Sequence, residues 1–205
     1  MTLLVDEKVA NAIDVSVYGG GVTASQCETL KAVGVELIIV GLWHGHKGNR
    51  FAAATLKNAH MAGLRTAGYT MLVPGDGALP IKMAQHYARD ADIFERLAFL
   101  ALDCEWRGLM EEDVHRCIME ANDVDATPVI YTGAWFWKGR LHNPTWAFET
   151  PLWDSDYDKG PDEPLTVDYG GWTNCVGRQY RGTDTFQGVS CDLNVFDRQC
   201  LQNRP

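Results

Sequence analysis

The sequence predicts an α/β protein whose parallel strands close into a β/α barrel. Apolar runs rich in β-branched residues alternate with helical patterns up to about residue 140. The runs are continuously apolar, which is typical of parallel strands covered by helices. The glycines at 19–21 follow the first strand but do not form the GxGxxG loop of an open nucleotide-binding sheet. No acidic residue ends the second strand either, so a closed barrel is favoured.

Each expected element has a local signal. Apolar runs predict strands at 11–17, 35–42, 65–72, 97–106 and 127–133. Helical patterns predict helices at 25–33, about 50–62, about 80–91 and 111–122. Ser25 is expected to cap the first helix, and Gly34 and Gly63 are expected to end the first and second helices. Together these elements indicate five β–α units.

The pattern changes after about residue 140. Residues 142–175 are rich in Pro, Trp, Asp and Gly and contain short extended pieces such as TPLWDSDY (150–157). A last strand is expected at 174–180, and Asp192 would follow it. No repeat or linker interrupts the chain, so a single domain over residues 1–205 is expected.

Charge and composition exclude several partners. The net charge of −9 and the pI near 5.0 argue against nucleic acid, which would require a basic face. No window approaches the roughly 18 apolar residues of a membrane span. The N-terminal stretch MTLLVDEKVANAID has no signal-peptide pattern. The expected protein is a monomer that stays cytoplasmic until it is released, or is exported by a route that the sequence does not show.

The six cysteines form no CxxC pair. Buried, reduced thiols are therefore favoured over a zinc site or a disulfide framework. A Cys175–Cys191 or Cys191–Cys200 bridge stays open, because pairing cannot be read from sequence.

Four carboxylates fall at expected strand ends: Asp14, Asp103, Glu105 and Asp192. In a β/α barrel, functional residues gather at the carboxyl ends of the strands. Positions 103 and 105 would point to one face, and like charges at that spacing raise each other's pKa. Such a pair can supply a general acid beside an ionised stabiliser or nucleophile, as glycosidases require.

Aromatic residues accompany the acids at or near the strand ends, where flat rings can stack on sugars: Tyr69, Trp106, Tyr131, Trp135, Trp137, Trp153 and Tyr180. The structural alternative is that the acids cap helices and the aromatic rings fill the core. Four acids on one barrel face favour function over this alternative.

His44 and His46 form an HxH pair after the second strand. With Asp14 and Asp103 they could bind zinc in a metal-dependent hydrolase. Two loop histidines that form hydrogen bonds or line a sugar site are the favoured interpretation, because no further histidine completes a site. No metal and no cofactor are expected.

An ordered set of motifs resembles glycoside hydrolase family 25, the lysozymes of the N-acetylmuramidase type. The motifs are AIDVS (12–16), LALDCEW (100–106), PVIYTGAWFW (128–137), PLW (151–153), RQY (178–180) and CDLNVF (191–196). The resemblance spans about residues 11–197. It implies a TIM-like β/α barrel of five β–α units followed by three closing strands.

The resemblance also implies roles for the four acids. Glu105 would donate a proton to the glycosidic oxygen, and Asp103 would stabilise the N-acetyl group or the positive charge at the anomeric carbon. Asp14 and Asp192 would complete the cluster by holding water and tuning its protonation. The implied reaction cleaves the β-1,4 bond between N-acetylmuramic acid and N-acetylglucosamine in peptidoglycan or a related polysaccharide. The expected substrate-binding residues are Tyr69, Tyr131, Trp135, Trp153, Gln179 and Tyr180.

The sequence departs from the family at the expected rim. GLWHG (41–45) stands where a KATEG-like segment is usual, and YTM (69–71) stands where YHF is usual. Arg178 replaces a usual Trp, and Asp154 replaces a small apolar residue. Two alternatives follow: a non-catalytic carbohydrate-binding barrel, and a hydrolase of another N-acetylhexosamine glycan.

Overall fold

The computed structural model describes residues 8–89 and 94–201. Eight of its nine described strands close a barrel in the order β1-β9-β8-β7-β6-β5-β4-β2, and the β1–β2 pairing closes the ring. The barrel strands are β1 (Val9–Val15), β2 (Val35–His44), β4 (Arg65–Met71), β5 (Leu100–Asp103), β6 (Pro128–Thr132), β7 (Leu152–Ser155), β8 (Gly177–Phe186) and β9 (Val189–Asp197). The two-residue strand β3 (Lys47–Gly48) pairs with the end of β2.

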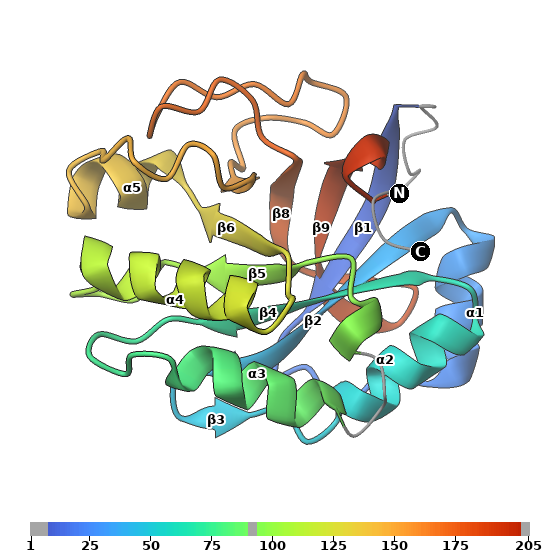
Figure 1. The fold of residues 1–205 in the computed structure, drawn as a ribbon. Helices are drawn as coiled ribbons and strands as arrows, with labels where there is room; N and C mark the ends of the chain where they lie inside the picture. The colour runs from blue at the N-terminus through green and yellow to red at the C-terminus, as the bar shows by residue number, and fades with distance from the viewer. Residues whose placement is uncertain (1–7, 90–93, 202–205) are drawn as a thin grey trace.

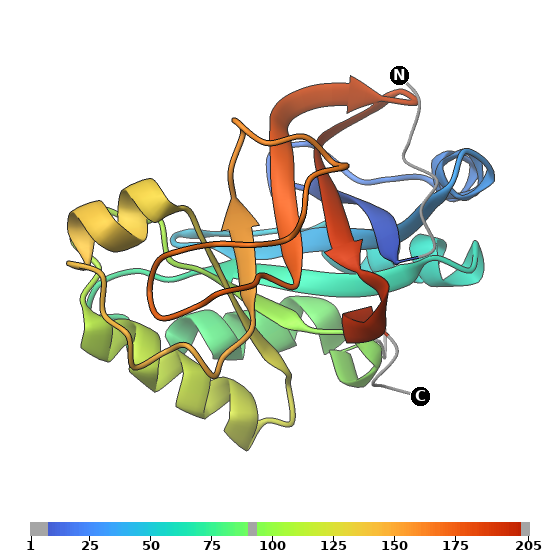
Figure 2. The same cartoon turned by 90° about the horizontal axis from the view of Figure 1, so that it is seen from above.

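Seven barrel strands are parallel, and β9 runs antiparallel to both of its neighbours, β8 and β1. The carboxyl ends of the parallel strands therefore share one rim, where barrel enzymes carry their sites. The hairpin of β8 and β9 extends beyond the other strands (Figure 2).

Helices connect the first five units and cover the barrel, whereas the long segment between β7 and β8 contains none (Figure 1). The helices are α1 (Ala24–Ala32), α2 (Ala52–Met61), α3 (Leu79–Arg89), α4 (Glu111–Asp123) and α5 (Ala134–Arg140). Two short 3₁₀ turns lie at Phe94–Arg96 and Arg198–Leu201. The predicted fold class, five β–α units followed by three closing strands, is confirmed.

The apolar residues form two layers. One fills the barrel and includes Ala10, Ala12, Leu37, Ile39, Ala67, Tyr69, Phe99, Ala101, Val129, Trp153 and Phe196. The larger layer lies between the strands and the helices. Alternation along the strands from β1 to β7 feeds both layers, which explains why these strands are mostly apolar before they reach the rim.

Two predicted boundaries were wrong near the start of the chain and at the fourth strand. Thr23, not Ser25, caps α1, because its hydroxyl accepts the Gln26 N–H while the Gln26 side chain accepts the Thr23 N–H. The stretch 97–106 contributes only Leu100–Asp103 to the sheet. A 3₁₀ turn precedes it, and the Asp103 carboxylate turns the chain by accepting a backbone N–H just after it.

The predicted last strand at 174–180 was also wrong. It begins at Gly177, continues to Phe186, and is followed by β9, which contains Asp192. In the outer half of β8, exposed Arg181, Thr183 and Thr185 alternate with half-buried residues, so this polar stretch gave no strand signal. The expected end of the third helix near residue 91 and the start of the N-terminal stretch lie outside the described residues.

All six cysteines lie in the described residues and none is paired, so neither bridge that the sequence left open is present. Among the described residues, no helix has the length and apolar character needed to cross a membrane.

Candidate active site

Four carboxyl groups meet in one pocket at the carboxyl ends of the strands. Asp14 comes from β1, Asp103 ends β5, Glu105 lies just after it, and Asp192 comes from β9. The pocket has a volume of about 140 Å³, and its other lining residues are Ser16, Tyr18, His44, Tyr69, Tyr131, Trp153 and Gln179. The structure thus brings together the four acids that the sequence offered as candidates.

Strand alternation sends Asp14 and Asp103 inward. Ala12 and Ala101 belong to the inner layer, and Asp14 and Asp103 follow each of them by two residues on the same face. Asp192 lies directly opposite Asp14 in the antiparallel β1–β9 pair. Because the antiparallel strand β9 closes the ring beside β1, acids that are far apart in the sequence become direct neighbours.

Gln179 of β8 connects the acids to two tyrosines. Its amide nitrogen donates to Asp14 at 2.8 Å and to Asp192 at 3.3 Å. Its carbonyl oxygen accepts from the hydroxyls of Tyr131 at 2.8 Å and Tyr157 at 2.6 Å. The carboxylates need a donor and the phenols need an acceptor, so this network has only one consistent amide orientation.

Asn194 gives Asp14 a second donor, at 2.8 Å, while the Asn194 carbonyl oxygen accepts the Trp153 indole N–H at 3.0 Å. Burial, followed by the charge of Asp192, raises the pKa of Asp14 to about 7, and these amide hydrogen bonds oppose the rise. Burial also raises the pKa of Asp192, and the hydrogen bond from the Thr183 N–H opposes it. The two acids face each other and titrate as a pair.

The carboxyl groups of Glu105 and Asp103 differ in pKa. Burial raises the pKa of Glu105 to about 8, and the charge of Asp103 adds to the rise. Burial raises the pKa of Asp103 to about 6, although the Glu105 N–H donates to its carboxylate at 3.0 Å. At pH 7 Glu105 is therefore protonated and Asp103 is ionised, a division of roles that suits acid catalysis.

Most of the expected substrate-binding residues lie at this pocket. Tyr69, Tyr131, Trp153 and Gln179 line it. Tyr180 does not, because its neighbour Gln179 faces the interior and Tyr180 packs against the outer layer instead.

Trp135 is 60% exposed and lines a separate groove of about 690 Å³. Tyr157 borders the same groove and also reaches Gln179, so the groove adjoins the acid pocket. Tyr157 was missed in the sequence. Its position two residues after Ser155, the end of β7, is the signal that could have found it.

Ser16 and Tyr18 were also missed, and both line the pocket just beyond β1. His44 lines it from the end of β2, whereas His46 is exposed and lies edge-on to Trp106. Within residues 8–89 and 94–201, no three His, Cys, Asp or Glu side chains are grouped to hold a metal ion.

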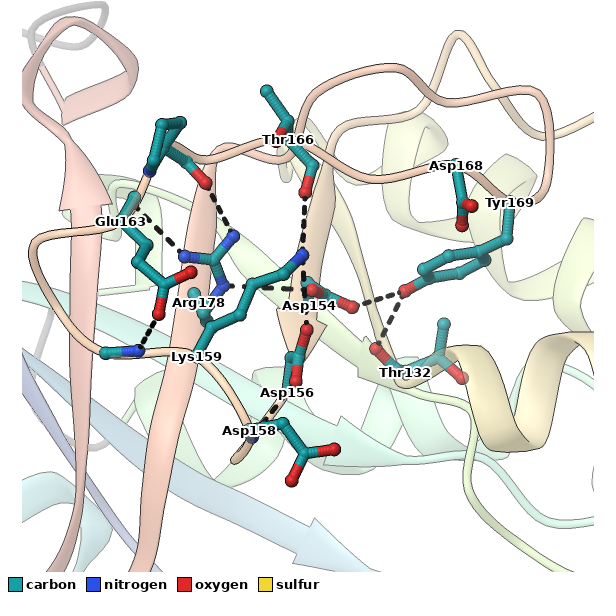
Figure 3. A network of polar contacts seen from close by, with 12 residues as sticks. Thr132, Asp154, Asp156, Asp158, Lys159, Glu163, Thr166, Asp168, Tyr169 and Arg178 are labelled. Atoms are coloured by element: carbon teal, nitrogen blue, oxygen red, sulfur yellow. Dashed lines mark hydrogen bonds and ion pairs between the residues drawn. The ribbon is translucent and has the colours of Figure 1, made fainter.

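Asp154 and Arg178, two departures from the family, form one buried pair on neighbouring strands. Arg178 Nε lies 4.0 Å from Asp154, and the guanidinium also donates to the carbonyls of Glu163 at 3.2 Å and Pro164 at 2.8 Å. Tyr169 donates to Asp154 from the other side at 2.7 Å (Figure 3). The pair therefore anchors the helix-free segment between β7 and β8 at two places, residues 163–164 and Tyr169. This segment lines the groove.

An acidic, aromatic-lined pocket at the mouth of a β/α barrel is the arrangement of a barrel glycosidase. A family model described as glycosyl hydrolases family 25 matches residues 13–189, and the chain belongs to this family, as its motifs predicted.

Solved structures support the same fold. A muramidase from Acremonium alcalophilum has a TM-score of 0.75 at 18% identity, with 94% of this chain and 96% of that chain covered. A bacterial lysozyme from Streptomyces coelicolor has a TM-score of 0.72 at 21% identity, with 93% of each chain covered. At this identity, the similarity establishes the fold.

A curated relative, the probable GH family 25 lysozyme 3 of Dictyostelium discoideum, is 32% identical over 84 residues. The match covers 40% of this chain and 18% of that protein, so this chain matches less than a fifth of the relative's length.

Proposed function

We propose that this protein is a muramidase that hydrolyses the β-1,4 bond between N-acetylmuramic acid and N-acetylglucosamine in peptidoglycan. One observation carries the proposal: Glu105 and Asp103 share one buried pocket, in which burial and the charge of Asp103 raise the pKa of Glu105. Membership of family 25 and the muramidases among its structural relatives support this choice of substrate.

In this proposal Glu105 protonates the glycosidic oxygen, because it carries a proton at neutral pH. Ionised Asp103 stabilises the N-acetyl group or the positive charge that develops at the anomeric carbon. Asp14 and Asp192 hold water and tune the protonation of the pocket through Gln179.

The pocket is small, so most of a polymeric glycan would lie outside it. Tyr69, Tyr131 and Trp153 would contact the sugar at the cleaved bond, and Trp135 would stack on a further sugar in the adjoining groove. The reaction needs no cofactor, since the acids supply the chemistry. We also propose that residues 1–205 form one catalytic domain, because the β1–β9 pairing joins the first and last described strands. This domain would act as a monomer at the cell wall.

The first test is digestion of purified peptidoglycan by the wild type, Glu105→Gln and Glu28→Gln. Glu28 is exposed on α1 and serves as the matched control. Mass spectrometry should find muropeptides with new N-acetylmuramic acid reducing ends from the wild type and the control only. Turnover by folded Glu105→Gln would remove Glu105 as the acid. Tight binding without fragments from the wild type would favour a carbohydrate-binding barrel, and cleavage of chitin alone would favour another N-acetylhexosamine glycan.

The variant Asp103→Asn distinguishes a role of Asp103 in stabilising the transition state from a role in binding the substrate. We expect it to lower kcat by about 10²-fold or more and to change KM little, because the charge acts in the transition state. A change in KM alone would contradict the stabiliser role.

A further inference from the structure

The second strand of the barrel contains a bulge at its rim. In the parallel pairing of β2 with β4, Gly41 pairs with Tyr69 and Trp43 pairs with Thr70. Leu42 is therefore the extra residue. A side chain at position 41 would collide with the Tyr69 ring, since an added Cβ would lie 2.7 Å from it. The glycine thus leaves room for Tyr69 to reach the pocket.

This bulge decides which residue faces the acids. Leu37 and Ile39 belong to the inner layer, so regular alternation would turn Trp43 inward and His44 outward. Instead, the Trp43 ring stacks on Tyr87 of α3 with centroids 6.4 Å apart, and His44 lines the acid pocket. Re-aiming a side chain beside a site is a known use of bulges.

Aromatic neighbours hold the His44 ring. The Tyr18 hydroxyl lies 3.4 Å from its Nδ1, and Trp106 meets it edge-on at 6.4 Å between centroids. The Lys47 ammonium lies 4.3 Å from the centre of the Tyr18 ring. When Nδ1 accepts the phenol proton, the ring proton is on Nε2, which has no partner among the described residues.

The charges of the pocket indicate which ligand group this N–H would bind. Of the described side chains that line the pocket, His44 is the only one that can carry a positive charge, against four carboxyl groups. A sugar that bears its own carboxyl group would be repelled by those acids unless a donor met it at the rim. N-acetylglucosamine carries no such group, whereas N-acetylmuramic acid carries one on its lactyl ether.

We propose that His44 is a specificity-determining residue that donates a hydrogen bond from Nε2 to the lactyl carboxyl group of muramic acid. The inference rests on the proposed function and names the part of the substrate that this rim recognises. The acceptor oxygen is present both in peptide-free strands, as a carboxylate, and in peptide-bearing strands, as an amide.

The test compares three substrates: peptide-free glycan strands, strands that bear stem peptides, and a chitin oligosaccharide. His44→Ala should lower kcat/KM about tenfold or more on both muramic acid glycans, the loss expected for a hydrogen bond to a charged or strongly polar group. A chitin oligosaccharide, which lacks the lactyl group, should bind Glu105→Gln with an affinity that does not change when His44→Ala is added. His44→Gln, which keeps an N–H donor, should restore part of the lost cleavage on both muramic acid glycans.

His46→Gln is the matched control, because His46 also contacts Trp106 but is exposed. A similar loss of affinity for the chitin oligosaccharide, or the same loss of cleavage in His46→Gln, would overturn the inference. Binding of peptide-free strands to Glu105→Gln, with and without His44→Ala, gives a readout by calorimetry that does not depend on turnover. Unchanged affinity there would overturn the role of His44 alone, whereas absence of wild-type cleavage would overturn the proposed function.

Discussion

The amide nitrogen of Gln179 donates a hydrogen bond of 2.8 Å to the carboxylate of Asp14, which lies 165 positions earlier in the chain. This contact joins the first strand to a closing strand across the mouth of the barrel. It also places one neutral side chain between two acids and two phenols, so the protonation of the pocket depends on how well Gln179 is held.

The first prediction concerns pH. Glu105 must be protonated and Asp103 ionised, so kcat/KM should follow a bell-shaped curve with limbs near pH 6 and pH 8. Asp103→Asn removes the like charge that raises the pKa of Glu105, so its alkaline limb should move to lower pH. An alkaline limb that stays in place in this variant would contradict the coupling.

The second prediction concerns stability. The pKa of Glu105 is raised in the folded state, so the unfolded chain loses its proton first as the pH rises from about 4.5 to about 8. Folding stability therefore falls across this range. Glu105→Gln removes the effect and should raise Tm relative to the wild type, more at pH 8 than at pH 5. A gain of 1 kcal/mol would correspond to about 2–4 °C for a chain of this size. Calorimetry at both pH values measures it, and equal gains at the two would exclude this origin.

The third prediction concerns Gln179. Gln179→Met keeps the volume but removes both the donor and the acceptor, leaving two carboxyl groups and two phenols without this partner. We expect a loss of about 1–3 kcal/mol of stability and a fall in activity of about tenfold or more. The pKa of Asp14 should rise further, which can be followed by NMR of its carboxyl carbon. Tyr157→Phe, which removes one donor only, should have a smaller effect on all three quantities.

The fourth prediction concerns the buried pair of Asp154 and Arg178. Arg178→Met leaves an uncompensated charge in the protein interior and should cost about 3–5 kcal/mol in urea unfolding. Adding Asp154→Asn removes that charge while keeping an acceptor for Tyr169, so the double variant should regain part of the loss. Lys138→Met, at an exposed pair with Asp168, should change stability by less than about 1 kcal/mol. Additive losses in the double variant would show that the two residues act independently.

Local patterns were enough for much of this fold. The continuous apolar strands and the first four helices follow from alternation and from burial between helices, which act over a few residues. Only the start of β8 was located and β9 was not, because the outer half of β8 is polar, with Arg181, Thr183 and Thr185 exposed, and resembles a loop. The helix α5 was not located, since it is short and its first turn is rich in tryptophan.

In the active site, too, local patterns were enough to find some residues and not others. Asp103 and Glu105 could be chosen from their spacing at the end of a strand, whereas Tyr18 carried no pattern of its own and Tyr157 could be found only once the end of β7 was known. Tyr180 belongs to the same motif as Gln179, but adjacent residues of a strand face opposite sides of the sheet. Gln179 therefore lies in the pocket, and Tyr180 packs against the outer layer.

The sequence by itself determined the class of fold, the family and the four acids, because strand periodicity and motif order can be read from neighbouring residues without knowing their contacts. Only the tertiary structure decided which groups touch. Closure of the ring brought Asp192 opposite Asp14, and a single bulge in β2 turned His44 rather than Trp43 toward the acids. Neither has a local signature, because both arise from the register between strands that are distant in sequence.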